Sequence, residues 1–253
     1  EDFGANEGRR LSGAIEDAAT RNVTIRVLLG GIKGPNSAEI DRLVTKYPSQ
    51  IFAETWDAEY WYGAGIMHQK FWIFDKRHIL VGSANQDWKS FTQVMELGVV
   101  VTNSVEIAGD LSNLFECWWA WSSLDFNGSR TIGSVEYFSE EYQTTLMVPR
   151  WSTSLENGVA SNPFGKFKSD YNIENQGITR LNGSLSKFFI SASPAEITVP
   201  GGRSFDEDAL IYTIRSAKKT VDLSVMDFVT TSLYPVDKNQ EGGGGVVWWY
   251  ALI

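Results

Sequence analysis

Residues 65–101 contain the sequence pattern that most constrains the fold of this chain. An apolar-rich run predicts a strand over residues 67–74, and polar residues 75–77 predict a turn. Residues 78–81 predict the returning strand of a hairpin, and a further strand is expected over residues 96–101. We expect the rest of the chain to be organised around this sheet.

Helix and strand patterns alternate before this stretch. Residues 7–21 place apolar side chains at helical spacing and are followed by a predicted strand over residues 23–29. Ser37 can cap a helix that extends to about Lys46, and a short strand is expected at residues 51–54. Two successive helix and strand units predict an α/β fold.

The tryptophan-rich stretch after the predicted sheet indicates a buried helix. Residues 105–121 carry large apolar side chains along one helical stripe. Trp118, Trp119 and Trp121 are therefore expected in the core or in an interface rather than on a base-stacking platform. Cys117, the single cysteine, has large apolar neighbours, and we expect a buried and unreactive thiol.

The length and composition allow one large or two small domains, with 253 residues of which 43% are hydrophobic. Residues 1–121 form the first expected part. Residues 122–200 are rich in Ser, Asn, Gly and aromatic residues and are expected to be a loop-rich surface excursion and linker, with one strand at residues 187–192. Residues 201–253 form the third expected part.

A second helix and strand unit begins in the third part. A helix is predicted over residues 205–218 and a strand over residues 220–226, in the same order as at the start of the chain. Four glycines follow Glu241, and the unit is not completed after them. We therefore expect the chain to be a fragment of a longer protein.

Polar side chains around the predicted hairpin suit phosphate chemistry. His68 and Lys70 alternate onto one face of the predicted strand. A neutral imidazole can attack phosphorus or move a proton, and a lysine ammonium can neutralise a phosphate oxygen. Ser83 and Asn85 follow Gly82 at a spacing that suits two donors converging on one anion.

Three further residues near the hairpin have alternative interpretations. Glu96 lies among apolar residues, where a carboxylate needs a partner, and pairing with the ring of His68 would fix the imidazole tautomer. Asp75 opens the turn, so both a catalytic role and a structural role in holding the motif fit its position. His78 lacks comparable companions and is expected to be a surface or hairpin residue.

Net charge and sequons bear on the environment of the protein. The formal net charge of -9 provides no general basic surface for nucleic acid or anionic membrane, so a phosphate-bearing substrate must be bound locally. Asn22, Asn127 and Asn182 each begin an Asn-X-Ser/Thr triplet, which is glycosylated only in a secretory lumen. No run of about 18 apolar residues occurs in the sequence.

The run HQKFWIFD through GSAN resembles the HKD signature of the phospholipase D superfamily. The continuation NQDWKSFTQVMELGVVV and the start EDFG most resemble its endolysosomal 5′ exonuclease branch, phospholipases D three and four. The resemblance returns at SASPAEITVPGGR and TVDLSVMDF. It implies an α-β-α sandwich with a mixed sheet, built from two HKD halves, of which this chain holds one half and the start of the second.

The resemblance also implies a mechanism without metal or cofactor. His68 would attack phosphorus to give a phosphohistidine, Lys70, Ser83 and Asn85 would hold the phosphate, and Glu96 would orient the imidazole. The histidine of the other half would protonate the leaving oxygen. Only one HKD motif is present in the sequence, so the second half is expected in a missing C-terminal region or in a homodimer mate.

The function implied by the resemblance is that of a hydrolase with several possible substrates. We expect a lumenal phosphodiesterase acting on single-stranded DNA or RNA ends. A phospholipid phosphodiesterase or transphosphatidylase and a catalytically silent structural homologue stay open as alternatives. The resemblance implies a glycoprotein of the endoplasmic reticulum or endolysosomal lumen, whose parent is anchored by a membrane helix upstream of these residues.

Overall fold

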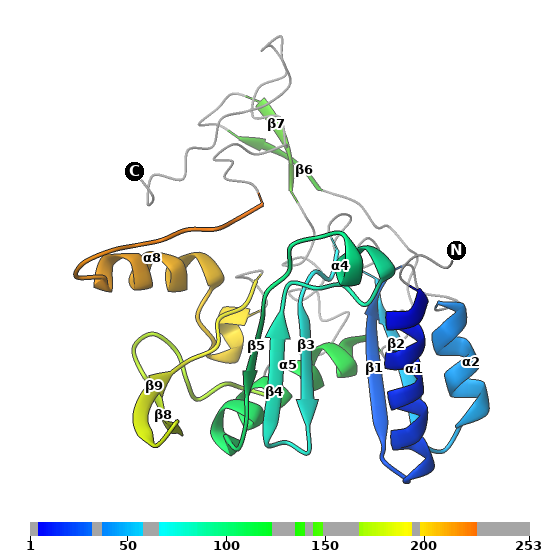
Figure 1. Ribbon diagram of the computed structural model, residues 1–253. Coiled ribbons are helices and arrows are strands. Elements are labelled where there is room, and N and C mark those ends of the chain that lie inside the picture. The colour runs from blue at the N-terminus through cyan, green and yellow to red at the C-terminus, as the bar shows by residue number, and fades with distance from the viewer. Residues whose placement is uncertain are drawn as a thin grey trace.

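The computed structural model describes residues 5–31, 37–57, 66–122, 135–139, 144–148, 167–193 and 198–226. These residues form the predicted α/β fold, with helices against small parallel and antiparallel sheets. Figure 1 shows helix α5 behind strands β3, β4 and β5, while α1 and α2 lie beside β1 and β2. No helix in the described part of the chain is both long and apolar enough to cross a membrane.

The first α/β unit follows the predicted order. Its elements are α1 (Ala5–Thr20), β1 (Ile25–Gly30), α2 (Ala38–Lys46) and β2 (Ile51–Trp56). The two strands are parallel, with Ile25 opposite Ile51, and α2 forms the crossover between them. Ser37 caps α2 as predicted, since its side-chain oxygen accepts the N–H of Ile40 at 3.4 Å.

The central sheet has the antiparallel order β3-β4-β5. Its strands are β3 (Lys70–Phe74), β4 (His78–Gly82) and β5 (Gly98–Val101), with α4 (Trp88–Thr92) between β4 and β5. The hairpin prediction is confirmed, but β3 and β5 begin later than predicted, so His68 and Glu96 precede their strands. At β5 the reason is visible: the Leu97 N–H donates to the Ser83 hydroxyl at 3.0 Å instead of to a strand partner.

Helix α5 (Val105–Ser122) supplies the core, as its sequence predicts. Trp118 and Trp121 are buried, and Trp119 is partly exposed and stacks on Phe115 at 5.6 Å between ring centroids. Cys117 is buried as well, and this burial raises the pKa of its thiol to about 12. The prediction of a buried cysteine is confirmed.

The prediction of a surface excursion is wrong for residues 167–193. Strands β8 (Gly177–Leu181) and β9 (Ser184–Phe188) form a hairpin in this segment, and the strand predicted over residues 187–192 ends at Phe188. The hairpin packs against the buried core around α5, where the Thr179 and Ser104 hydroxyls lie 2.9 Å apart. A buried polar residue such as Thr179 interrupts the apolar alternation that would have revealed β8.

A second unpredicted hairpin lies earlier in the segment of residues 122–200. It is formed by β6 (Val135–Ser139) and β7 (Thr144–Val148). Beyond it, η2 (Val199–Gly201) precedes α8 (Asp206–Ser216), which confirms the predicted helix at residues 205–218. The strand predicted over residues 220–226 does not form, because no neighbouring strand in the described part of the chain completes a ladder with it. Its apolar side chains are exposed instead.

Candidate active site

A cavity of about 460 Å³ opens beside the start of β3. Three of the predicted site residues line it: His68, Lys70 and Ser83. Lys70 is the first residue of β3 and pairs with Gly82, which directly precedes Ser83. The hairpin therefore brings the two ends of the motif together, as its sequence predicts.

The Lys70 ammonium lies beside the backbone of His68, which also lines this cavity. Its Nζ donates to the His68 backbone carbonyl at 2.8 Å. Partial burial lowers the pKa of Lys70 below its ordinary value, and the carboxylates of Glu96 and Asp87 oppose that effect. Among the described residues no carboxylate is hydrogen-bonded to this ammonium, and a partly desolvated cation of this kind is suited to bind an anion.

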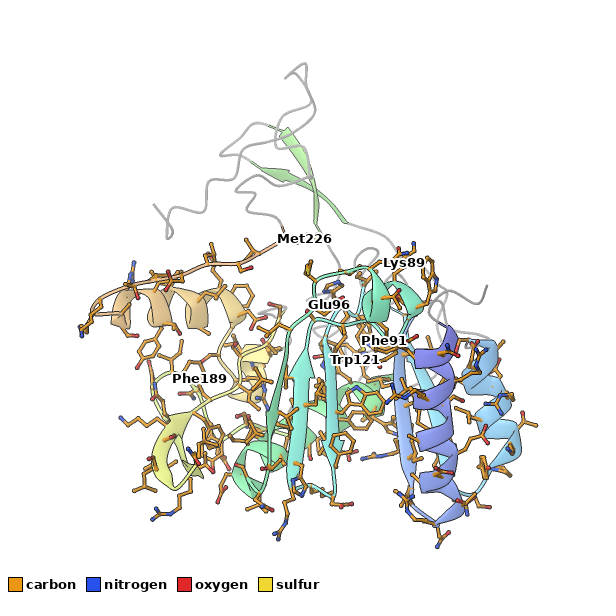
Figure 2. The ribbon with its side chains drawn as sticks, in the orientation of Figure 1. Lys89, Phe91, Glu96, Trp121, Phe189 and Met226 are labelled. Atoms are coloured by element: carbon orange, nitrogen blue, oxygen red, sulfur yellow. The ribbon has the colours of Figure 1, made fainter. Side chains whose placement is uncertain are left out.

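Glu96 contacts Ser83 rather than His68. The Ser83 hydroxyl donates to the Glu96 carboxylate at 2.5 Å. Figure 2 shows Glu96 at the end of the sheet that adjoins α4. In the described part of the chain the His68 side chain forms no hydrogen bond, so the predicted pairing of Glu96 with the imidazole is corrected to a pairing with Ser83.

Gly82 makes the approach of Ser83 to Glu96 possible. A Cβ at this position would lie 2.9 Å from the Leu97 carbonyl oxygen and 3.3 Å from the Gly98 Cα. The Ser83 N–H donates to that same carbonyl at 3.0 Å. A side chain at residue 82 would therefore separate β4 from the segment that carries Glu96.

Asn85 lies beside the cavity and not among its lining residues. Its backbone N–H donates to the Ser90 hydroxyl at 3.2 Å, and its side chain is exposed and bonds to Asp87. Asp87 caps α4, and the bond from the Ser90 N–H lowers the pKa of its carboxyl. Asn85 is thus held in the cap of α4, next to the phosphate-binding candidates.

Asp75 lies at the opposite end of β3 from Lys70. Asp75 is five positions after Lys70, which corresponds to about 16 Å along a strand. Asp75 and Lys76 both adopt positive φ, 53° and 51°, in the turn of the hairpin. This position accounts for the turn and gives Asp75 no place in the cavity lining.

Two features of the site escaped the sequence analysis. Asp87 faces Lys70, and the helix-capping pattern of an Asp three residues before Ser90 could have identified its position. The far wall of the cavity includes Ile190 and Ser191, more than 100 residues after the motif, and no local pattern indicates their approach.

The remaining candidates lie away from the cavity. His78 is a hairpin residue, as predicted, and its Nδ1 accepts the Asn103 N–H at 3.3 Å. Asn22 and Asn182 are exposed at turns, whereas Asn127 lies outside the described residues. Among the described side chains no cluster of three or more His, Cys, Asp or Glu could hold a metal ion.

Two family matches cover most of the chain. Residues 3–119 match the family described as cardiolipin synthase, PLD-like domain, and residues 151–241 match the family described as PLD3/4, PLD-like domain. The fold and the matches define a chain made of phospholipase D-like domains. The chain belongs to the phospholipase D superfamily, in its PLD3/4 branch.

Individual relatives are longer than this chain. A 5′-3′ exonuclease PLD3 of Xenopus tropicalis is 32% identical over 66% of this chain and 27% of that protein. The Homo sapiens 5′-3′ exonuclease PLD3 is 26% identical over 90% of this chain and 39% of that protein. A probable phospholipase D of Caenorhabditis elegans is 27% identical over 92% of this chain and 36% of that protein. The chain therefore spans well under half of the length of these relatives.

A comparison with solved structures finds NucT from Helicobacter pylori, with a TM-score of 0.37 and 21% sequence identity. The match covers 44% of this chain and 72% of NucT.

Proposed function

We propose that this chain carries one half of the active site of a phosphodiesterase that removes nucleotides from single-stranded nucleic acid ends. The observation that carries the proposal is the cavity that His68, Lys70 and Ser83 line together. The relatives named 5′-3′ exonuclease support nucleic acid as the substrate. The proposal concerns the whole parent protein, because the chain spans 27% and 39% of these two relatives.

The proposed reaction begins at His68. Its imidazole has no hydrogen-bond partner in the described part of the chain, so a ring nitrogen is available to attack phosphorus. A nitrogen–phosphorus bond forms, and the bond from phosphorus to the leaving nucleoside oxygen breaks. Lys70 neutralises a non-bridging oxygen of the transition state. Water then cleaves the phosphohistidine and regenerates the imidazole.

Ser83 and Glu96 act as a pair in this proposal. Since the Ser83 hydrogen is donated to Glu96 at 2.5 Å, the hydroxyl is not free to donate to the phosphate while that bond is intact. We assign to Ser83 the task of holding the Glu96 carboxylate near Lys70, where it favours the charged ammonium. Asn85, at the adjacent helix cap, is the remaining candidate donor to the phosphate.

The second half of the site supplies the acid that protonates the leaving oxygen. It comes from the part of the parent that follows these residues or from a second copy of the chain. The proposed location is the endoplasmic reticulum or endolysosomal lumen, supported by the PLD3/4 relationship and by exposed sequons at Asn22 and Asn182. An upstream membrane helix would anchor the parent there.

The test compares His68→Ala with His78→Ala in the full-length parent. The substrate is a single-stranded oligonucleotide with a free 5′-hydroxyl, and the readout is nucleotide release at acid and neutral pH. Removing the nucleophile should lower the rate by at least about 10²-fold, whereas His78→Ala should retain activity because His78 lies in the far turn of the hairpin. Equal activity of the two variants would refute the assignment of His68.

A phospholipid substrate is the second candidate, because most of the cavity wall is apolar. Release of the headgroup from mixed phospholipid vesicles, assayed on the same protein sample, separates the two substrates. Faster turnover of vesicles than of oligonucleotides would replace the nuclease proposal with a phospholipase. Inactivity of the wild-type parent on both would support a catalytically silent homologue.

A further inference from the structure

Most of the side chains that line the cavity are apolar. We define the apolar chamber by Phe71, Ile79, Val81, Leu111, Leu114 and Ile190. Phe71 lies opposite Val81 in the register, one step from the Lys70–Gly82 pair. Ile79 precedes Ser83 by four residues, so the chamber follows β4 for about 13 Å from the phosphate-binding end. A group attached to a bound phosphate has space to enter it.

Charged side chains hold the far wall of the chamber in place. Arg203 donates through Nη1 to the Ile190 carbonyl at 3.0 Å and to Asp110 of α5 at 2.7 Å. Ser191, the next residue in the wall, donates to Asp206 of α8 at 2.6 Å. These bonds join the wall to two helices, so the chamber is a preformed pocket with a fixed opposite side.

We propose that the apolar chamber binds the nucleobase of the nucleotide whose phosphate lies at Lys70. This inference rests on the proposed function, because it takes a nucleotide as the ligand. A nucleobase has apolar faces that the chamber can cover and polar edges that need hydrogen-bond partners. Gln69 lines the same cavity and offers an amide donor and acceptor. The Ser191 hydroxyl, whose hydrogen is donated to Asp206, can accept a bond from the base edge, whereas an acyl chain would leave both groups unused.

Binding of matched small ligands to the 253-residue chain tests the proposal by isothermal titration calorimetry. Adenosine 5′-monophosphate and adenosine 3′-monophosphate carry a base, whereas ribose 5-phosphate has sugar and phosphate alone. At least one of the two adenosine phosphates should bind about tenfold or more tightly than ribose 5-phosphate, which corresponds to the usual contribution of one stacked base. Equal affinities of all three would overturn the proposal.

A chamber-filling variant and a matched control locate the effect. Val81→Phe places a ring in the chamber and should abolish the advantage of the base-containing ligand while leaving ribose 5-phosphate affinity unchanged. Val23→Phe makes the same change at an exposed position before β1, outside the cavity lining. This variant should bind all ligands as the wild type does.

A measurement on the wild-type chain keeps the test valid if Val81→Phe fails to fold. In methyl-labelled protein, the adenosine phosphate should shift the methyl resonances of Val81 and Leu114, and ribose 5-phosphate should not. Unshifted methyl groups at saturation would refute a base in the chamber. A short-chain phosphatidic acid, below its micellar concentration, provides the lipid arm.

Tighter binding of phosphatidic acid than of either adenosine phosphate, lost in Val81→Phe, would assign the chamber to an acyl chain and overturn the proposal. Neither measurement depends on turnover. If the full-length parent failed to cleave oligonucleotides while base-dependent binding persisted, the proposed reaction would fall and the base site would stand.

Discussion

Two clusters of charged residues in this molecule differ in how completely they are satisfied. Asp110 accepts bonds from Arg203 and from the Ser169 hydroxyl, and the Asp110 and Arg203 side chains are 1% and 5% exposed. At the cavity, the Lys70 ammonium bonds to a backbone carbonyl, and His68 is without a side-chain hydrogen bond in the described residues. The first cluster stabilises the fold, and the second leaves capacity for a ligand.

The largest effect is expected from Asp110→Ala, which breaks the satisfied cluster. The variant leaves the Arg203 guanidinium buried without its carboxylate, which typically costs about 3–5 kcal/mol of unfolding free energy. Urea denaturation measures the change. Asp170→Ala, at an exposed neighbouring position, serves as the control and should change stability by less than about 0.5 kcal/mol. Similar losses of unfolding free energy in Asp110→Ala and Asp170→Ala would show that the buried ion pair contributes no more to stability than an exposed aspartate does.

An intermediate effect is expected from Arg26→Met. The Arg26 guanidinium bonds to both carboxylate oxygens of Glu116, at 2.9 Å and 2.5 Å, and lies 4.8 Å from the Phe115 ring centroid. Because both side chains are partly exposed, at 33% and 27%, we expect a loss of roughly 1 kcal/mol of unfolding free energy. Chemical denaturation at pH 7 provides the measurement.

The contribution of Arg26 should also depend on pH. The hydrogen bonds from Arg26 lower the pKa of Glu116 in the folded state. The stabilisation is therefore present above the unfolded-state pKa of a glutamate and is lost as the pH falls through the lower folded-state pKa. The difference in stability between wild type and Arg26→Met should shrink in strong acid. A difference independent of pH would show that ring contacts, not the ion pair, dominate.

A smaller effect on stability is expected from Lys70→Met in the second cluster. Partial burial lowers the pKa of Lys70 in the folded state, so the unfolded state binds that proton more tightly. The charged lysine thus opposes folding below its folded-state pKa, and stability recovers as the pH rises. We expect Lys70→Met to change stability by no more than about 0.5 kcal/mol at pH 7. A large loss in denaturant titration would identify Lys70 as a structural residue.

The smallest expected change follows Glu96→Gln. Burial is the main cause of the lowered pKa of Lys70, and the Glu96 carboxylate opposes it. Removing that carboxylate should therefore lower the Lys70 pKa further, as measured by NMR titration of the lysine side chain. Glu106→Gln is the control, because Glu106 accepts a bond from Thr179, and it should leave the titration unchanged. An unaltered Lys70 titration in Glu96→Gln would contradict the electrostatic link.

Local patterns predicted most of the described fold. The helical stripe of α5, the Ser37 cap and the hairpin around Asp75 each depend on neighbours in sequence, and each formed as predicted. The start of β5 at Gly98 was displaced by a hydrogen bond of the site itself, from the Leu97 N–H to the Ser83 hydroxyl. Propensity alone does not contain that bond.

The candidate site was predictable only in its local half. His68, Lys70 and Ser83 meet because the two strands of one hairpin are in register. The sequence analysis paired Glu96 with His68, whereas the structure pairs it with Ser83. The alternation of side chains along a strand predicts the face of the sheet on which a residue lies, but not which of two nearby side chains it contacts. Ile190 and Arg203 contribute to the far wall of the cavity through tertiary contacts. No hydrophobic periodicity or motif in their own segments predicts those contacts.

The bond between Arg203 and Asp110 also has a kinetic consequence. It joins residues 93 positions apart, so the intervening chain must be closed into a loop before the bond can form. Closing a flexible loop of that length costs about 4 kcal/mol from its length dependence alone, whereas the β3–β4 hairpin closes locally. We therefore expect the hairpin to fold early, and the cavity to acquire its far wall late, near the end of folding.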